Sequence, residues 1–257
     1  MMSRHITRLI HDSWILFKRS VRIALRNPEA LTQATITPFF LMFLFGNVFG
    51  NIVSVGDFNY IDFIIPGIIL QSVAQASMYS AVNVSSDMTG GMIDRFRSMP
   101  IAKSTVLIGH AGASMVRNTI TTVIIIGTAF LLGFRPQGDV VELLMAGGLL
   151  ILIMAAISLI AVLCGLLAKT SEGAGGLMFP LFILPFISSG FAPTETMSRS
   201  VRWFAEIQPM SPIIDALRAL LLGLPLGNTL WVALAWCMGI IVVTFVIAAQ
   251  VYARKVS

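Results

Sequence analysis

Six uninterrupted apolar stretches constrain the fold of this chain more than any other feature of its sequence. Each is about 20 residues or longer, the length at which an α-helix crosses the hydrocarbon core of a bilayer. Only 11% of the 257 residues are charged, against about 25% in ordinary globular domains. Because the stretches are continuous rather than alternating, they favour membrane helices over an outer-membrane β-barrel. We therefore expect an all-α integral membrane protein with six transmembrane helices, at about 31–53, 60–82, 113–134, 142–168, 173–191 and 228–251.

The sequence predicts one transmembrane domain with a short segment in front of it. No charged or Gly/Ser-rich linker separates the six stretches, and we find no internal repeat among them. Residues 28–257 are therefore expected to form a single six-span domain. Residues 1–27, which are rich in Arg and Lys, are expected to form a separate helix.

The distribution of Lys and Arg predicts the orientation in the membrane. When the connections are assigned alternately to the two sides, thirteen of the seventeen basic residues fall on one side, Arg117 among them. Cytoplasmic loops of membrane proteins carry this excess of positive charge. Both termini are therefore expected to face the cytoplasm. The net charge of +5 is explained in this way without a nucleic-acid partner, and we expect none.

The N-terminal segment has the pattern of a basic amphipathic helix. At about 100° per residue, its basic side chains fall within a narrow arc and most of its apolar side chains lie opposite. Such a helix lies in the membrane interface with its apolar face in lipid. Lipid anchoring alone and contact with a soluble partner both remain open. The defining residues are Arg8, Trp14, Lys18, Arg19, Arg22 and Arg26.

A second candidate segment lies between the second and third apolar stretches. Its sequence GMIDRFRSMP places apolar side chains at helical spacing between glycine and proline, with charged residues on the remaining faces. A short helix bounded in this way is suited to insertion into a groove of another protein. The alternative is a basic interfacial loop that only follows the positive-inside rule. The residues concerned are Gly91, Met92, Asp94, Arg95, Phe96, Arg97 and Pro100.

The second apolar stretch carries a polar face. Gln71, Gln75 and Tyr79 recur at four-residue spacing and so lie on one side of a helix. An amide inside hydrocarbon is costly unless it is paired, so this face must turn toward protein or a cavity. Hydrogen bonding between helices and lining of a substrate path are both compatible with the pattern.

The connection before the last stretch contains two helix starts, at Ser198 and at Ser211, where a serine precedes a helical pattern. Asp215 and Arg218 are spaced to pair on one helix face. Neither helix is long enough to span the bilayer. We expect an external re-entrant helical hairpin that dips into the outer leaflet and covers the bundle.

Several motifs of catalysis and nucleotide binding are missing from the sequence. It has no GxxxxGK[ST] phosphate loop, no HExxH and no GxSxG. The middle of the apolar stretches carries no acidic residue, whereas ion-coupled carriers place ionisable groups there. We therefore expect no enzyme, no metal and no cofactor in this chain, and energy for any directional transport would come from another chain.

The sequence resembles the type-2 ATP-binding-cassette (ABC) export permeases, and among them the daunorubicin-resistance-type membrane subunits. The resemblance is carried by YIDFIIPG at 60–67, GMIDRFRSMP at 91–100 and SGFAP at 189–193, followed by the pattern that runs to Gly223. These elements occur in the family's order over nearly the whole chain.

The resemblance implies an exporter of amphipathic or hydrophobic compounds, such as a drug, lipid or glycolipid, in the bacterial cytoplasmic membrane. ATP and Mg²⁺ would be bound by a separate ATP-binding subunit. A second permease copy would complete the transmembrane unit, most simply as a homodimer. The alternative is an energy-independent membrane scaffold or passive carrier.

The resemblance also implies roles for the candidate segments. The 91–100 segment would be the coupling helix seated in the ATPase, and the N-terminal helix would be the interface helix beside it. The external hairpin would close the exit. Its gate residues would be Pro193, Trp203, Asp215 and Arg218.

Overall fold

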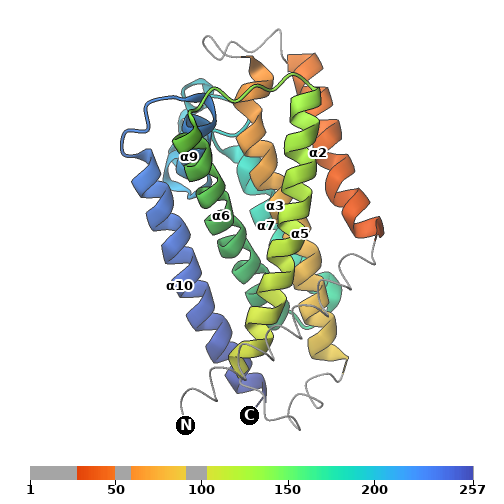
Figure 1. Cartoon of the computed structure of the whole chain (residues 1–257). Coiled ribbons are helices and arrows are strands. Elements are labelled where there is room, and N and C mark those ends of the chain that lie inside the picture. The colour runs from red at the N-terminus through yellow and green to blue at the C-terminus, as the bar shows by residue number, and fades with distance from the viewer. Residues whose placement is uncertain (1–27, 50–58, 91–102, 257) are drawn as a thin grey trace.

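The computed structural model describes residues 28–49, 59–90 and 103–256, and this part of the chain is helical with no β-strand. Five long helices run along the bundle (Figure 1). They are α2 (Pro28–Phe49), α3 (Tyr60–Thr89), α5 (Lys103–Leu131), α6 (Val140–Leu167) and α10 (Thr229–Val256). The shorter elements are α7 (Ser171–Ile183), η1 (Leu184–Ile187), η2 (Thr194–Thr196), α8 (Arg199–Ile207) and α9 (Met210–Leu222).

Four of the described helices are long and apolar enough to cross a membrane: α3, α5 from Leu107, α6, and α10 to Lys255. They coincide with the second, third, fourth and sixth predicted stretches. The predicted bounds are close for α6 and α10, but α3 continues to Thr89 and α5 already begins at Lys103. The first and fifth stretches correspond to α2 and α7, whose apolar described parts are shorter, Ile36–Val48 and Ser171–Ile187.

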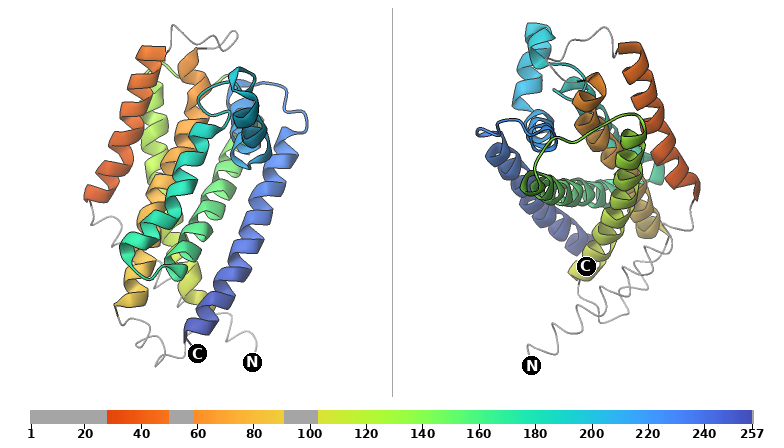
Figure 2. Two further views of the ribbon diagram at one scale, coloured as in Figure 1. Left: turned by 180° about the vertical axis from the view of Figure 1, so that it is seen from behind. Right: turned by 45° about the horizontal axis from the view of Figure 1, so that its top comes forward.

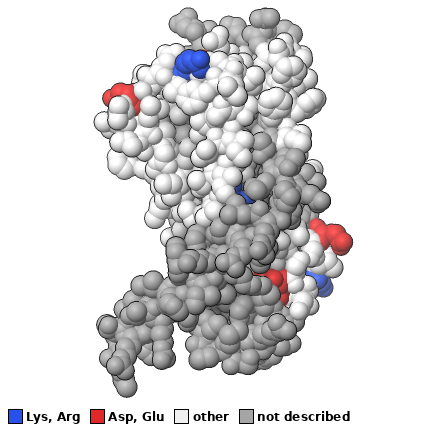
Figure 3. All heavy atoms as spheres, turned by 45° about the vertical axis from the view of Figure 1, so that its right-hand side comes forward, with Lys and Arg blue, Asp and Glu red and all other residues white. Residues whose placement is uncertain are grey.

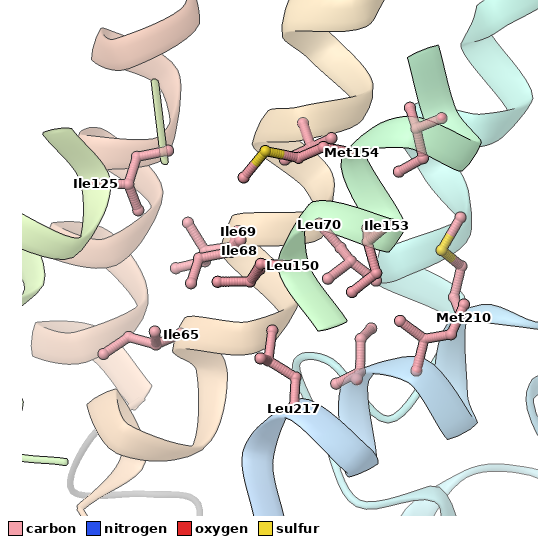
Figure 4. Packing of buried hydrophobic residues seen from close by; sticks show 14 of the residues in the cluster. Ile65, Ile68, Ile69, Leu70, Ile125, Leu150, Ile153, Met154, Met210 and Leu217 are labelled. Atoms are coloured by element: carbon pink, nitrogen blue, oxygen red, sulfur yellow. The ribbon is translucent and has the colours of Figure 1, made fainter. Parts of the chain in front are cut away.

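The helix α3 is the centre of the bundle. It packs against α2, α5, α6, α7 and α9, and 78% of its most apolar 18-residue window is buried, against 22% for α10. Lipid tails are as apolar as leucine, so close van der Waals packing rather than exclusion of water holds such helices together. Figure 4 shows part of the shared core, which also receives buried side chains from α2, α7 and α10. The residues labelled there are Ile65, Ile68, Ile69 and Leu70 of α3, Ile125 of α5, Leu150, Ile153 and Met154 of α6, and Met210 and Leu217 of α9.

Close backbone approach fixes the crossing of α3 and α6. A Cβ atom on Gly165 of α6 would lie 2.5 Å from the Ala81 carbonyl oxygen and 2.6 Å from the Val84 Cβ. Real Cβ atoms do not come this close to other atoms, so only glycine allows the two helices to touch here. This is the packing that small residues provide in membrane bundles.

The two ends of the bundle differ in structure. The end of α3, the start of α5, the connection from α6 to α7 and the end of α10 lie together, and we call this the α10 C-terminal end (Figures 1 and 2). The helices α8 and α9 lie at the opposite end, which we call the α8–α9 end. The connections from α3 to α5 and from α6 to α7 lie at one end of the bundle, and the connection from α5 to α6 lies at the other. The connections therefore alternate between the two ends, as predicted.

The lateral surface is largely apolar. On the face shown in Figure 3, the coloured charged side chains lie mainly toward the two ends, with one small blue patch between them. Large apolar side chains are exposed along α10, including Trp231, Trp236, Val242 and Phe245. A water-soluble monomer rarely exposes so much contiguous apolar surface, which agrees with a protein that sits in a membrane.

The fifth predicted stretch is not one continuous α-helix. The helix α7 ends at Ile183, and the chain continues as the 3₁₀ turn η1, in which Pro185 occupies a first-turn position. Proline has no N–H to donate to the preceding turn of an α-helix, and 3₁₀ turns are common where α-helices end. Residues 188–191 then leave the helical path altogether and lead into the α8–α9 end.

Candidate functional site

Two sets of predicted site residues lie outside the described part of the chain. These are the amphipathic helix over 1–27 and the segment 91–100. The remaining predicted residues fall into two regions: a cluster at the α8–α9 end, and the polar face of α3 in the middle of the bundle.

The cluster at the α8–α9 end is organised by Arg218 of α9, which is only 8% exposed. Its Nη1 donates to Oδ1 of Asp215 at 2.6 Å, as the spacing predicts. Its Nε donates to the Phe63 carbonyl oxygen of α3 at 3.1 Å. Its Nη2 donates to the Ser189 carbonyl oxygen. One side chain thus joins α9, α3 and the 188–191 segment.

The guanidinium of Arg218 is held electrostatically as well as by hydrogen bonds. Burial lowers the pKa of Arg218, and the Asp215 carboxylate partly offsets this shift. The guanidinium carbon also lies 3.9 Å from the centroid of the Phe63 ring, a geometry in which the ring face attracts a cation. An arginine is effectively always protonated in proteins, so these contacts hold a permanent positive charge inside the α8–α9 end.

The 188–191 segment is fixed from both sides by further hydrogen bonds. Tyr60 Oη of α3 donates to the Phe191 carbonyl oxygen at 2.7 Å. The backbone N–H of Ser189 donates to Ser211 Oγ of α9 at 3.2 Å. Just before the segment, Gln208 at the end of α8 donates through Nε2 to the carbonyl oxygen of Ile187, the last residue of η1, at 2.9 Å. Buried backbone groups that have left a helix need such partners, and here α3, α9 and the end of α8 supply them.

A pair of glycines allows this segment to lie directly on α3. A Cβ atom on Gly67 would be 2.7 Å from the Gly190 carbonyl oxygen, and one on Gly190 would be 3.2 Å from Gly67 Cα. Backbone therefore touches backbone between helix and segment. The sequence SGFAP has its glycine at the point where no side chain fits.

The predicted gate residues are only partly brought together. Asp215 and Arg218 form the expected pair, whereas Trp203 is 65% exposed on α8. Pro193 lies half-buried just before η2, and its carbonyl accepts from the N–H and hydroxyl of Thr196. Among the described contacts, no hydrogen bond, ion pair or ring contact joins Pro193 or Trp203 to the Arg218 cluster.

The prediction that Ser211 caps a helix is wrong. The helix α9 begins at Met210, two residues before the start that a Ser211 cap would give, and Pro209 occupies the cap position. The Ser211 hydroxyl instead accepts from Ser189, as described above. The hydroxyl that the local sequence pattern predicts to cap the helix is used instead in a tertiary hydrogen bond with the 188–191 segment. Ser198 does occupy the cap position of α8, but its side chain makes no capping hydrogen bond.

The polar face of α3 is buried in the bundle. Gln75 Nε2 donates to Thr37 Oγ1 of α2 at 3.4 Å, a hydrogen bond between helices. Both amide atoms of Gln71 are buried with no hydrogen-bond partner in the described structure. Tyr79 is half-buried one turn beyond Gln75. One predicted amide therefore pairs across helices and the other faces the packed interior.

The polar interior extends to α5 and α6. Asn118 Nδ2 of α5 donates to Ser77 Oγ of α3 at 2.9 Å and approaches Ser158 Oγ of α6 at 3.2 Å. Three central helices are thus linked by one side chain. Such hydrogen bonds between helices help to fix how membrane helices are placed against one another, although each contributes only about 0.6–2 kcal/mol to stability.

Comparison with protein families shows to which family this chain belongs. The family model described as "ABC-2 type transporter" matches residues 11–222, most of the chain. The chain belongs to the ABC-2 type transporter family. The resemblance seen in the sequence is therefore confirmed, and the chain is a permease of the ABC type.

Individual relatives agree with the family match. This ABC-2 permease is 27% identical over 197 residues to the "Daunorubicin resistance ABC transporter permease protein DrrB1" of Streptomyces coeruleorubidus, covering 76% of this chain and 70% of the relative. It is 26% identical over 222 residues to the "Probable doxorubicin resistance ABC transporter permease protein DrrC" of Mycobacterium tuberculosis, covering 86% and 80%. It is 27% identical over 186 residues to the "Inner membrane transport permease YadH" of Escherichia coli, covering 68% and 70%.

Membership of the family has two direct consequences. ABC-2 permeases are the membrane-spanning subunits of ABC transporters and are not themselves catalytic. The family also implies an ATP-binding subunit as partner. The expected class of protein, a membrane transport subunit rather than an enzyme, is thereby supported.

Sequence reasoning missed the position of Arg117 in this ABC-2 permease. The count of basic residues groups it with a cytoplasmic connection, although the predicted span 113–134 contains it; in the structure it lies inside α5 and is only 5% exposed. The missed signal is a polar stripe at helical spacing, Ser114, Arg117, Asn118 and Thr121, all of them buried. In an otherwise apolar helix, such a stripe indicates a face turned toward protein.

Proposed function

We propose that this ABC-2 permease is the membrane subunit of an exporter that moves an amphipathic or hydrophobic compound out of a bacterial cell. The observation that carries the proposal is the family match over residues 11–222, together with relatives named for daunorubicin and doxorubicin resistance. A drug, lipid or glycolipid would all suit the largely apolar bundle. Energy would come from ATP, bound with Mg²⁺ by the separate ATP-binding subunit.

The proposed arrangement in the membrane has six spans, with α2 and with α7 plus η1 as the first and fifth. Both termini and the α10 C-terminal end would face the cytoplasm, the side to which the sequence pattern assigns most of the basic residues. The α8–α9 end would face outward as the re-entrant hairpin. The 1–27 helix would lie in the inner interface and the 91–100 segment would dock on the ATP-binding subunit.

In the proposed transport cycle, a movement that starts at the ATP-binding subunits is transmitted along α3 to the α8–α9 end. Binding of ATP would close the two ATP-binding subunits and move the 91–100 segments, and the bundles of two permease copies would rearrange along their shared face. The α8–α9 end is fastened to α3 through Arg218 and the glycine pair, so a movement of α3 would carry the exit hairpin with it. Gln71, Gln75 and Tyr79 would face the path or the helices beside it.

Co-purification from native membranes tests the proposal. The tagged chain is extracted in mild detergent and its partners are identified by mass spectrometry. We expect an ATP-binding subunit in equal amount, and ATP-dependent uptake of a fluorescent anthracycline into inside-out vesicles. An intact permease dimer that reproducibly lacks any ATP-binding subunit would contradict the exporter and favour an energy-independent carrier or scaffold.

A further inference from the structure

A polar cavity of about 100 Å³ lies between α3 and α5 near the α10 C-terminal end. On this measure a single water needs only about 10–15 Å³, so the cavity has room for a larger polar group. Its polar lining comes from both helices: Ser80, Asn83, Ser86 and Asp87 of α3, and His110 and Arg117 of α5. Asn83 and Ser86 are exposed, whereas Ser80 and Arg117 are buried, so the cavity deepens toward the arginine.

The arginine at the deep end has an unmatched charge. Arg117 is 5% exposed, and its Nε and Nη1 have no hydrogen-bond partner in the described structure. The carboxylate that lines the same cavity, Asp87, lies 3.5 Å from His110 Nε2, and no described carboxylate pairs with Arg117. Its one charge interaction given by the described structure is with the Tyr79 side chain, which is not a carboxylate. A buried guanidinium with two unpaired nitrogens and no carboxylate beside it is unfavourable. A ligand that supplies anionic oxygens would remove this cost.

The depth of the cavity in the bilayer indicates which anion is available there. About 20 residues of helix cross the 30 Å hydrocarbon core. On α3, 20 residues counted from Tyr60 place the far boundary of the hydrocarbon near Ser80. On α5, 20 residues counted back from Leu131 place the same boundary near residue 111. The mouth of the cavity therefore lies at about the level of the lipid headgroups of one leaflet. The backbone of Arg117, six residues further along α5, lies about 9 Å inside the hydrocarbon, and a long arginine side chain can reach from there toward the headgroups.

We propose that this cavity binds the phosphate of an anionic phospholipid headgroup, with Arg117 as the cation that receives it. A guanidinium matches phosphate oxygens with several N–H donors. The Ser80 hydroxyl, which is buried and has no hydrogen-bond partner among the described residues, supplies a further donor in the same cavity. The acyl chains remain in the surrounding lipid. This site is separate from the proposed transport role, since it requires neither ATP nor the partner subunit.

Native mass spectrometry of the purified permease tests the site. The delipidated chain in detergent is titrated with phosphatidylglycerol, and the apparent Kd of the first bound lipid is measured. We expect Arg117→Gln to weaken this affinity about tenfold or more, because a charge-assisted contact is lost, and Arg117→Lys to retain part of it. Arg254→Gln, an exposed arginine at the same end of the bundle, is the matched control and should bind as the wild type does.

Three outcomes would overturn the proposal. The first is unchanged phosphatidylglycerol affinity in Arg117→Gln. The second is an equal loss in Arg254→Gln, which would indicate general attraction of anionic lipid. The third is displacement of the lipid by millimolar inorganic phosphate, which would assign the cavity to a soluble anion. Folding is checked in the lipid-free state, where Arg117→Gln should unfold at a temperature no lower than that of the wild type, since it removes an unpaired buried charge.

Discussion

Arg218 and Phe63, 155 residues apart in sequence, are joined twice over: the arginine Nε donates to the Phe63 carbonyl oxygen at 3.1 Å, and its guanidinium carbon lies 3.9 Å from the centroid of the Phe63 ring. Through this double contact the hairpin at the α8–α9 end is fastened to the central helix α3. The same arginine holds the 188–191 segment through the Ser189 carbonyl. In this ABC-2 permease the hairpin is therefore a part of the bundle and not a loose connection over it.

Substitution of Arg218 should destabilise the whole α8–α9 end. We expect Arg218→Gln to lower the free energy of unfolding by about 2–4 kcal/mol, because the buried Ser189 carbonyl and the partly buried Phe63 carbonyl lose charge-assisted hydrogen bonds. Unfolding is followed by tryptophan fluorescence during titration with a denaturing detergent. The control is Arg202→Gln on α8, whose pair with Glu206 at 2.7 Å is largely exposed to solvent and should contribute little. Equal losses in both variants would argue against the Arg218 cluster.

The contact between Gly67 and Gly190 predicts a steric effect. Gly67→Ala should lower the free energy of unfolding by about 1–3 kcal/mol, because the added methyl group would push the 188–191 segment away from α3. Gly147→Ala on α6 is the matched control, since a Cβ there meets no atom within 4 Å. Alanine is the better helix former, so the control should be neutral or stabilised by up to about 1 kcal/mol. A neutral Gly67→Ala would show that the backbone contact is looser than described.

The two amides of α3 should respond differently to replacement by methionine. Gln71→Met removes a buried amide without a described partner and should raise the free energy of unfolding by about 1 kcal/mol. Gln75→Met removes the hydrogen bond to Thr37 and should lower it by about 0.5–1 kcal/mol. Both are measured with the same detergent titration. If Gln71 faces the substrate path, the stabilised variant should also show reduced anthracycline efflux, and unchanged efflux would assign Gln71 to packing.

The coupling role of the 91–100 segment predicts loss of transport without loss of folding. Arg97→Glu and Phe96→Asp should abolish ATP-dependent uptake into inside-out vesicles, because each places an unfavourable charge in the proposed contact with the ATP-binding subunit. Arg199→Glu, an exposed arginine at the α8–α9 end, is the control and should transport normally. Full transport by both coupling variants, at wild-type levels in the membrane, would exclude the assignment.

Features set by short-range spacing could be predicted from the sequence. The class of protein and the places of the long helices follow from runs of apolar residues, since a helix that crosses lipid must satisfy its own backbone and show apolar side chains. The pairing of Asp215 with Arg218 follows from the three-residue spacing on one helix. That Gln71 and Gln75 face inward follows from the cost of an unpaired amide in hydrocarbon. Each of these inferences needs only the geometry of a single helix.

Features that join distant segments were decided by the tertiary structure. The charge count groups Arg117 with a connection, and the local pattern gives Ser211 a capping role. Neither holds in the structure, because helix packing, not local pattern, determines what lies next to these side chains. The contacts of Arg218 with Phe63 and Ser189 and the close approach of Gly67 to Gly190 depend on how α3, α9 and the 188–191 segment are placed relative to one another. The physical reason is that the spacing of residues along one helix is fixed by its turn, whereas the neighbours across helices are chosen by packing of the whole bundle.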